Sequence, residues 1–187
     1  MHNIHNIMEI VQLNAKAKLS EHLASPSEAA LGHSNKLDGS HLSPNFTLGE
    51  FTKSGSHPEV YNIPSHEAIA NLTNLTKWLE VLRKRYNAKY GVGEEPIRIN
   101  SGYRSPQLNK KIGGVATSNH LTGCAVDIRV LGMEQLIRYA AILLDYADES
   151  KQEFDELLIE KNRYGAIWLH FAVRPANNRR KILFINA

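Results

Sequence analysis

The sequence has almost no cysteine, no long apolar run and little excess charge of either sign. Its single cysteine, Cys124, excludes an internal disulfide and any metal site built from several thiolates. No window approaches the roughly 18 consecutive apolar residues of a membrane-spanning helix, so no membrane span is expected. Lys and Arg number 22 and Asp and Glu 19, and the formal net charge of +3 is too small to indicate nucleic-acid binding. A bound metal ion would therefore need histidine and carboxylate ligands.

The start of the chain shows no secretory signal peptide, because residues 1–6 hold neither a basic leader nor a continuous apolar stretch. The protein is therefore expected to be made in the cytoplasm, with no visible export route. Residues 1–44 include a long polar run that is typical of an N-terminal extension or linker. Residues 45–187 have the size of one ordinary domain. The basic cluster at residues 179–181 is interpreted as solvated surface.

From residue 45 onward, the spacing of apolar residues predicts both helices and strands. The predicted helices are a short one after Thr47, residues 69–86, a turn after Ser105 and residues 133–146; the predicted strands are residues 96–100, 124–130, 156–160, 166–172 and 182–185. The third and fourth strands have the spacing of a hairpin, and the last is expected at a sheet edge. This order predicts an α+β fold with a mainly antiparallel sheet flanked by helices.

Two polar residues interrupt the apolar strands. Asp127 and His170 each face away from their apolar neighbours, because successive side chains of a strand alternate between its faces. Taken singly, Asp127 is interpreted as one half of a salt bridge or as a loop cap, and His170 as a hydrogen-bonded core histidine. Together with His120, they form a set of two imidazoles and one carboxylate that leaves a fourth zinc position open for water. Iron or copper could use similar ligands.

Three motifs in order along the chain resemble one family. Residues 118–127 match the Ser-x-His-x-x-Gly-x-Ala-x-Asp pattern of the zinc D-alanyl-D-alanine carboxypeptidase family of peptidoglycan peptidases, which share the hedgehog-type DD-peptidase fold. Residues 168–171 resemble its Trp-x-His segment, and residues 101–105 resemble its arginine motif. Residues 46–51 are similar to the opening of the phage-type members. The resemblance covers residues 45–173 and implies a hedgehog/DD-peptidase-like fold.

The resemblance implies that His120, Asp127 and His170 hold Zn²⁺. It also implies that Arg104 binds a substrate carbonyl or carboxylate and stabilises the developing oxyanion, for which a guanidinium is suited. A structural ion pair with a carboxylate such as Asp127 is the alternative for this arginine.

Two further residues of these motifs are candidates for binding substrate. Ser118 would donate or accept a hydrogen bond with the substrate, and the alternative is that it caps its own loop. Trp168 is expected to line the substrate cleft, although packing alone would explain it.

The general base does not follow the family pattern. Many members place a carboxylate three residues before the third ligand, and here that position is Ile167, which cannot transfer a proton. Glu160 is the best substitute, because the predicted hairpin places it on the strand next to His170. Its alternative is an exposed carboxylate at a strand end. Glu156 and Asp155 are the fallback candidates for the base.

The resemblance therefore implies a zinc-dependent peptidase that hydrolyses amide bonds of peptidoglycan stem peptides, as a carboxypeptidase or an endopeptidase. Because Ile167 stands where a carboxylate is usual, a non-catalytic cell-wall-binding module is the first alternative. A phage structural component that docks through residues 1–44 is the second. The expected partners are stem peptides and not nucleic acid, a monomer is expected, and the site of action is the cell wall.

Overall fold

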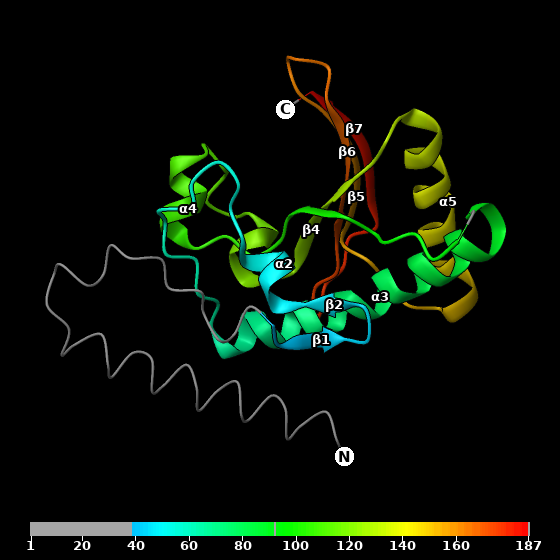
Figure 1. Cartoon of the computed structure of the whole chain (residues 1–187), viewed down its shortest axis with the longest axis horizontal. Coiled ribbons are helices and arrows are strands. Elements are labelled where there is room, and N and C mark those ends of the chain that lie inside the picture. The colour runs from blue at the N-terminus through cyan, green and yellow to red at the C-terminus, as the bar shows by residue number, and fades with distance from the viewer. Residues whose placement is uncertain (1–38, 92, 187) are drawn as a thin grey trace, which may run out of the picture.

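The computed structural model describes residues 39–91 and 93–186 (Figure 1). A five-stranded sheet stands at its centre with strand order β3-β4-β6-β5-β7. Its strands are β3 (Ile99–Ser101), β4 (Ala125–Arg129), β5 (Glu156–Lys161), β6 (Ile167–Ala172) and β7 (Lys181–Asn186). The predicted α+β class and the predicted hairpin of β5 and β6 are confirmed.

The last strand, β7, is the exception to the antiparallel pairing of this sheet. β7 forms the edge of the sheet as predicted, but it pairs in parallel with β5, whereas every other pair in this sheet is antiparallel. The connection from Val173 to Arg180 passes the residues just before β5, where the backbone N–H of Arg180 donates to the carbonyl oxygen of Phe154. β7 therefore begins beside Glu156 and runs in the direction of β5. Residue spacing in the sequence carries no information about this direction.

Two long helices cover one face of the sheet. α3 (His66–Tyr90) begins at Ser65, whose hydroxyl accepts a hydrogen bond from the backbone N–H of Ala68. α5 (Met133–Ser150) packs against α3 through Tyr146, whose ring centre lies 4.9 Å from that of Trp78. The helix-facing side chains of the sheet form the core with these helices, and they include Val126, Ile128, Leu157, Leu169 and Phe171. Among the described residues, no helix combines the length and the apolar character of a membrane span.

A small two-stranded sheet, whose first strand lies before residue 45, also packs on this core. β1 (His41–Ser43) pairs with β2 (Phe46–Thr47), and the side chains of Leu42 and Phe46 are buried. Glu80 of α3 accepts hydrogen bonds from this hairpin, so the hairpin is fixed to the long helix. The packed part of the chain thus begins inside the predicted extension of residues 1–44, and the rest of that extension, residues 1–38, lies outside the described residues.

Short elements lie on the other side of the sheet from α5 (Figure 1). They are α2 (Leu48–Thr52), α4 (Pro106–Lys111) and the 3₁₀-helix η1 (Asn119–Thr122). The predicted short helix after Thr47 is present and begins with a capping box, because the backbone N–H of Thr47 donates to the carboxylate of Glu50. The sheet therefore has one face covered by long helices and one face beside loops and short turns, and the polar residues of interest lie on the second face.

Candidate metal centre

The loop before β4 fixes the position of His120. The hydroxyl of Ser118 accepts the backbone N–H of His120 and starts η1, which ends at Gly123 with φ of +72°. A Cβ at Gly123 would lie 2.4 Å from the carbonyl oxygen of Ala68, so only glycine lets the loop rest on α3 at this point. His120 Nδ1 lies 2.5 Å from the carbonyl oxygen of Gly102. Because a carbonyl can only accept, Nδ1 carries the proton and Nε2 keeps its lone pair.

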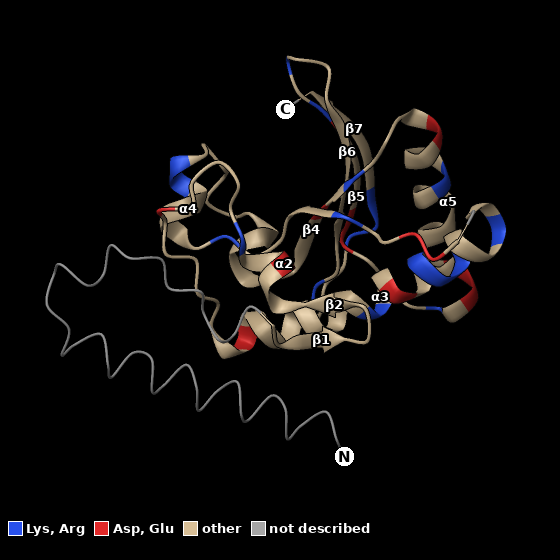
Figure 2. Cartoon of the chain, viewed as in Figure 1, with Lys and Arg blue, Asp and Glu red and all other residues tan. Residues whose placement is uncertain are grey.

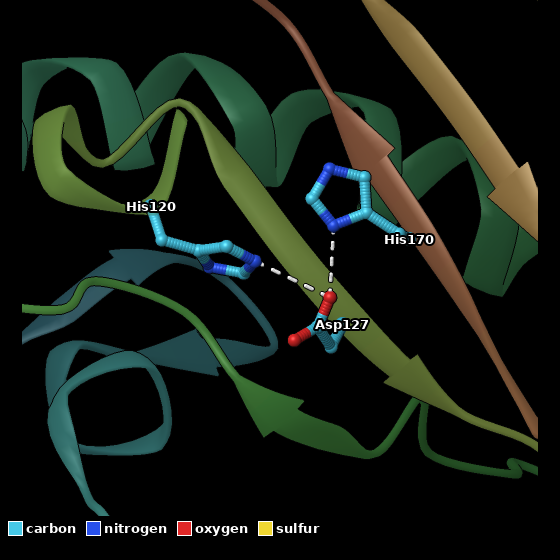
Figure 3. Close-up of side chains that lie close together, drawn as sticks. All are labelled: His120, Asp127 and His170. Atoms are coloured by element: carbon cyan, nitrogen blue, oxygen red, sulfur yellow. Dashed lines mark hydrogen bonds and ion pairs between the residues drawn. The ribbon is translucent and has the colours of Figure 1, made fainter. Parts of the chain in front are cut away.

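The sheet register brings the other two residues together. Asp127 on β4 is directly opposite His170 on β6, so their side chains leave the sheet from the same face. Asp127 Oδ1 lies 2.9 Å from His170 Nδ1 and 3.3 Å from His120 Nε2 (Figure 3). The ligand atoms of the three residues all lie within 4.8 Å of one another. The predicted convergence of these residues is therefore present in the structure.

The three side chains are 2% (His120), 6% (Asp127) and 7% (His170) exposed, so burial and mutual attraction compete. Burial opposes ionisation of Asp127, but the adjacent His120 and His170 outweigh it and hold the pKa of this carboxyl well below its ordinary value. Burial lowers the pKa of His120 despite the neighbouring carboxylate. Burial also acts against the charged form of His170, but its hydrogen bond to Asp127 and the negative charge of the nearby Glu156 carboxylate raise its pKa. The centre thus combines one ionised carboxylate with one neutral imidazole.

The donor set fits a divalent metal ion. His120 Nε2 and Asp127 Oδ1 face each other with lone pairs, and His170 Nε2 is buried with no hydrogen-bond partner among the described residues. A cation held by Nε2 of His120, Asp127 and Nδ1 of His170 would leave the N–H of His170 Nε2 facing Glu156 Oε2, 3.5 Å away. Two imidazoles and one carboxylate form a common ligand set of catalytic zinc.

Arg104 contacts the same carboxylate from the other side. Its guanidinium lies 2.5 Å from Asp127 Oδ2, and its Nε donates to Ser101 Oγ at 2.9 Å. The ion pair considered as the alternative for Arg104 is therefore present, and it fixes the orientation of the Asp127 carboxylate. Ser118 likewise caps its own loop, as its alternative interpretation had it. Both residues lie beside the centre, and their substrate roles stay predictions.

Glu160 and Trp168 form the next row of the sheet. They are paired across β5 and β6 two residues from His170, on the face of the metal centre. Burial raises the pKa of Glu160, although the positive charge of His170 opposes this shift. A carboxylate with a raised pKa exchanges a proton more readily near neutral pH than an exposed one. Glu160 therefore lies one row from His170 with a pKa above its ordinary value, and its role as the base stays a prediction.

The two fallback carboxylates are held by ion pairs. Glu156 receives hydrogen bonds from Asn119 at 3.0 Å and Arg179 at 2.9 Å, and its pKa is lowered to about 2 by its interactions with His170 and these partners. Asp155 is fully buried and is hydrogen-bonded to both Asn119 and Arg179. Both carboxylates are therefore already engaged by Asn119 and Arg179 beside the metal centre, which makes Glu156 and Asp155 poor candidates for the base.

Sequence reasoning missed the roles of Asn119 and Arg179. Arg179 lies on the surface, as interpreted for residues 179–181, and its side chain is 50% exposed. Its guanidinium nevertheless pairs with both Asp155 and Glu156, which the sequence did not indicate. Arg180 of the same cluster pairs with Asp148, but that contact is on the surface. The position of Asn119 between Ser118 and His120 in the motif was the one available signal, since a side chain there must lie close to the centre.

An α+β fold that carries such a two-histidine, one-aspartate centre is consistent with a metallopeptidase of the predicted family. Residues 44–152 match the family model of Peptidase M15, which is more than half of the chain, and the chain therefore belongs to the peptidase M15 family. The matched range includes His120 and Asp127 and ends before His170.

A curated relative is the zinc D-Ala-D-Ala carboxypeptidase of Streptomyces albus G, with 31% identity over 84 residues. That alignment covers 45% of this chain and 31% of the relative, so it spans about a third of the relative's length. The predicted family is confirmed by these matches.

Proposed function

We propose that this chain is a zinc-dependent peptidase that hydrolyses amide bonds of peptidoglycan stem peptides. The observation that carries the proposal is the convergence of His120, Asp127 and His170 on one point of the open sheet face. Zinc held there would polarise the substrate carbonyl and lower the pKa of water to about 7. Membership of the peptidase M15 family and the printed activity of the Streptomyces albus G relative support this assignment.

Glu160 is proposed as the general base. Its carboxylate takes a proton from the attacking water and then returns that proton to the nitrogen of the leaving amine, so the proton count closes over the cycle. Burial raises the pKa of Glu160, which favours this exchange near neutral pH. The hairpin of β5 and β6 thus supplies the carboxylate that Ile167 cannot supply.

Arg104, Ser118 and Trp168 are proposed to position the substrate. Arg104 uses one nitrogen for Asp127 and another for Ser101, and its remaining N–H groups are directed to the substrate carbonyl oxygen, where negative charge develops. Trp168 stands beside Glu160 and supplies an apolar wall for the substrate. Ser118 holds the loop of His120 and contributes to the substrate only through its position.

The substrate class follows from the family and the relative. The relative is named for action on D-Ala-D-Ala, which makes a D-amino acid next to the cleaved bond the first substrate to test. Release of a terminal D-alanine would identify a carboxypeptidase, and cleavage inside a stem or cross-link would identify an endopeptidase. Because this substrate lies in the cell wall, the protein is proposed to act there after synthesis in the cytoplasm.

The test combines metal analysis with digestion of purified muropeptides by zinc-loaded protein. We expect about one zinc per chain and hydrolysis that stops after chelation. Glu160→Gln should keep the zinc and lose about 10²- to 10⁴-fold in kcat, since a general base contributes that much. Glu153→Gln is the matched control, because Glu153 is an exposed carboxylate just before β5.

Two results would contradict this proposal. If the zinc-loaded protein binds muropeptides and cleaves none of them, the non-catalytic cell-wall module replaces the peptidase. If Glu160→Gln and Glu153→Gln are equally active, hydrolysis does not use Glu160 and the proton acceptor lies elsewhere.

A further inference from the structure

Two arginines stand side by side where β3 and β4 meet. The backbone N–H of Arg129, the last residue of β4, donates to the carbonyl oxygen of Arg98 at 2.9 Å. The next residues, Ile99 and Ile128, are paired across the same two strands. Arg98 and Arg129 are therefore directly opposite each other, and directly opposite residues project from the same face of a sheet. Figure 2 shows blue Lys and Arg positions on the ribbon near the upper end of β4.

This face is the one that carries the metal centre. Arg129 follows Asp127 by two residues on β4, so both side chains leave the strand on the same side. Two residues of strand place their Cα atoms about 7 Å apart. Arg129 is also directly opposite Trp168, which is in turn directly opposite Glu160. A carboxylate, an indole and a guanidinium thus form one row across β5, β6 and β4, adjacent to the row of His170 and Asp127.

The two arginines differ from every other arginine in the chain. Within residues 39–91 and 93–186, the side chains of Arg98 and Arg129 have no hydrogen bond, ion pair or ring contact, and both residues are exposed. The arginines that pair with a carboxylate or an aromatic ring are Arg83, Arg85, Arg104, Arg138, Arg163, Arg174, Arg179 and Arg180. Like charges directly opposite each other in a sheet are destabilising, and an anion bound between them would remove this repulsion. The pair is therefore an uncompensated cationic site beside the metal centre.

We propose that Arg98 and Arg129 bind a carboxylate of the peptide substrate, one or two residues from the bond that is cleaved. An extended peptide advances about 3.3–3.6 Å per residue, so this separation spans the interval between the two rows of the sheet. Guanidinium groups hold carboxylates with paired, charge-assisted hydrogen bonds. Arg104 cannot serve equally well, because its guanidinium is already bound to Asp127. This inference rests on the proposed function, and it adds an anionic substrate group to it.

The carboxylate has two sources in a stem peptide. It is either the free C-terminus of the chain that is cleaved or the acidic group of an internal residue. The first source would make the arginine pair a carboxypeptidase feature, and the second would suit cleavage inside the stem. Both present the same chemistry to Arg98 and Arg129, so the peptides chosen for the test must separate them.

The experiment measures binding without turnover, using zinc-loaded Glu160→Gln protein and calorimetry. The probes are acetyl-D-Ala-D-Ala, the same dipeptide with a C-terminal amide, and the tripeptide L-Ala-D-Glu-L-Lys amide with its D-Gln counterpart. Arg98→Gln and Arg129→Gln are introduced singly into this background. Arg83→Gln is the matched control, because it removes the same charge from α3, the helix behind the sheet.

We expect each substitution at Arg98 or Arg129 to weaken binding of one carboxylate probe by about tenfold or more, the value of a hydrogen bond to a charged group. The neutral counterpart of that probe should bind as before, and Arg83→Gln should change nothing. The affected probe identifies the source: acetyl-D-Ala-D-Ala for a terminal carboxylate, the D-Glu peptide for an internal one. Higher ionic strength should weaken this binding in the unmodified arginine background only.

This experiment tests the anionic subsite and the peptidase activity independently of each other. Equal affinity of all arginine variants for every carboxylate probe would overturn the anionic subsite while muropeptide hydrolysis by the unmodified protein stands. Charge-selective loss of binding in a protein that cleaves no muropeptide would support the subsite and overturn the peptidase proposal.

Discussion

The two faces of the central sheet serve different purposes with the same five strands. On the face covered by α3 and α5, residues such as Phe171 are fully buried among aromatic and aliphatic side chains. On the opposite face, the neighbouring residue His170 meets Asp127 and a row of further polar side chains. Because strand side chains alternate, one residue step separates packing from chemistry. Stability and activity should therefore respond to different residues of the same strand.

The largest expected effect comes from removing the carboxylate of the metal centre. Asp127→Asn should lower zinc affinity and reduce hydrolysis by about 10³-fold or more, because the metal contributes several kcal/mol to the transition state. The fold should persist, since the core lies on the other face. Chelator competition, muropeptide digestion and circular dichroism measure these three properties. Asp145→Asn, on the exposed side of α5, is the control. Full activity of Asp127→Asn would contradict the assignment of chemistry to this face of the sheet.

A substitution on the helix-covered face should act on stability instead. Phe171→Ala removes a ring that contacts Trp78 and Phe154 at centroid distances of 5.3 Å and 5.7 Å. We expect a loss of about 3–5 kcal/mol in the free energy of unfolding, as for other buried aromatic residues. Trp168→Ala on the open face should cost less stability and act on substrate affinity. Urea unfolding of the metal-free proteins makes the comparison, and equal losses for both variants would contradict the division of roles between the faces.

The smallest expected effect concerns the support of the centre at acid pH. The folded pKa of Glu156 is lowered to about 2 from an ordinary value of 4.5, mainly by its contact with His170. A lowered carboxyl pKa contributes stability that is present above pH 4.5 and is lost as the pH falls through about 2. Metal-free Glu156→Gln should therefore be less stable than the unmodified protein by about 1–3 kcal/mol at pH 7.

The difference between the Glu156→Gln and unmodified proteins should shrink as the pH falls from 4.5 toward 2, and unfolding by urea at several pH values measures it. If the difference in stability does not depend on pH, the charge of Glu156 does not contribute to stability, and the effect of Glu156→Gln comes from packing alone. Gln152→Glu provides a reverse charge change at an exposed position nearby.

The local elements of the fold could be predicted from the sequence, but their long-range relations could not. The position of Thr47 and the apolar spacing of residues 69–86 indicate helices directly, and the structure contains them. The parallel direction of β7 and the packing of Leu42 depend on partners far along the chain. No local pattern encodes such partners.

The candidate site follows the same division. His120, Asp127 and His170 were predictable because two of them are polar residues inside apolar strands and all three lie in family motifs. The orientation of Arg104 toward Asp127 needed coordinates, since the sequence allows both that ion pair and a free guanidinium. Arg179 was missed because an ion pair with a buried carboxylate and a solvated arginine have the same local sequence.

The contact between Gly123 and Ala68 has a consequence for transplantation of this centre into another scaffold. Asp127 and His170 come from adjacent strands and would travel with a short β-hairpin-like module, whereas His120 rests on the first turn of α3 through a glycine that admits no side chain. A designer who copied the two strands alone would deliver two of the three ligands. The smallest portable version of the site therefore includes the opening turn of that helix, cut together with its loop.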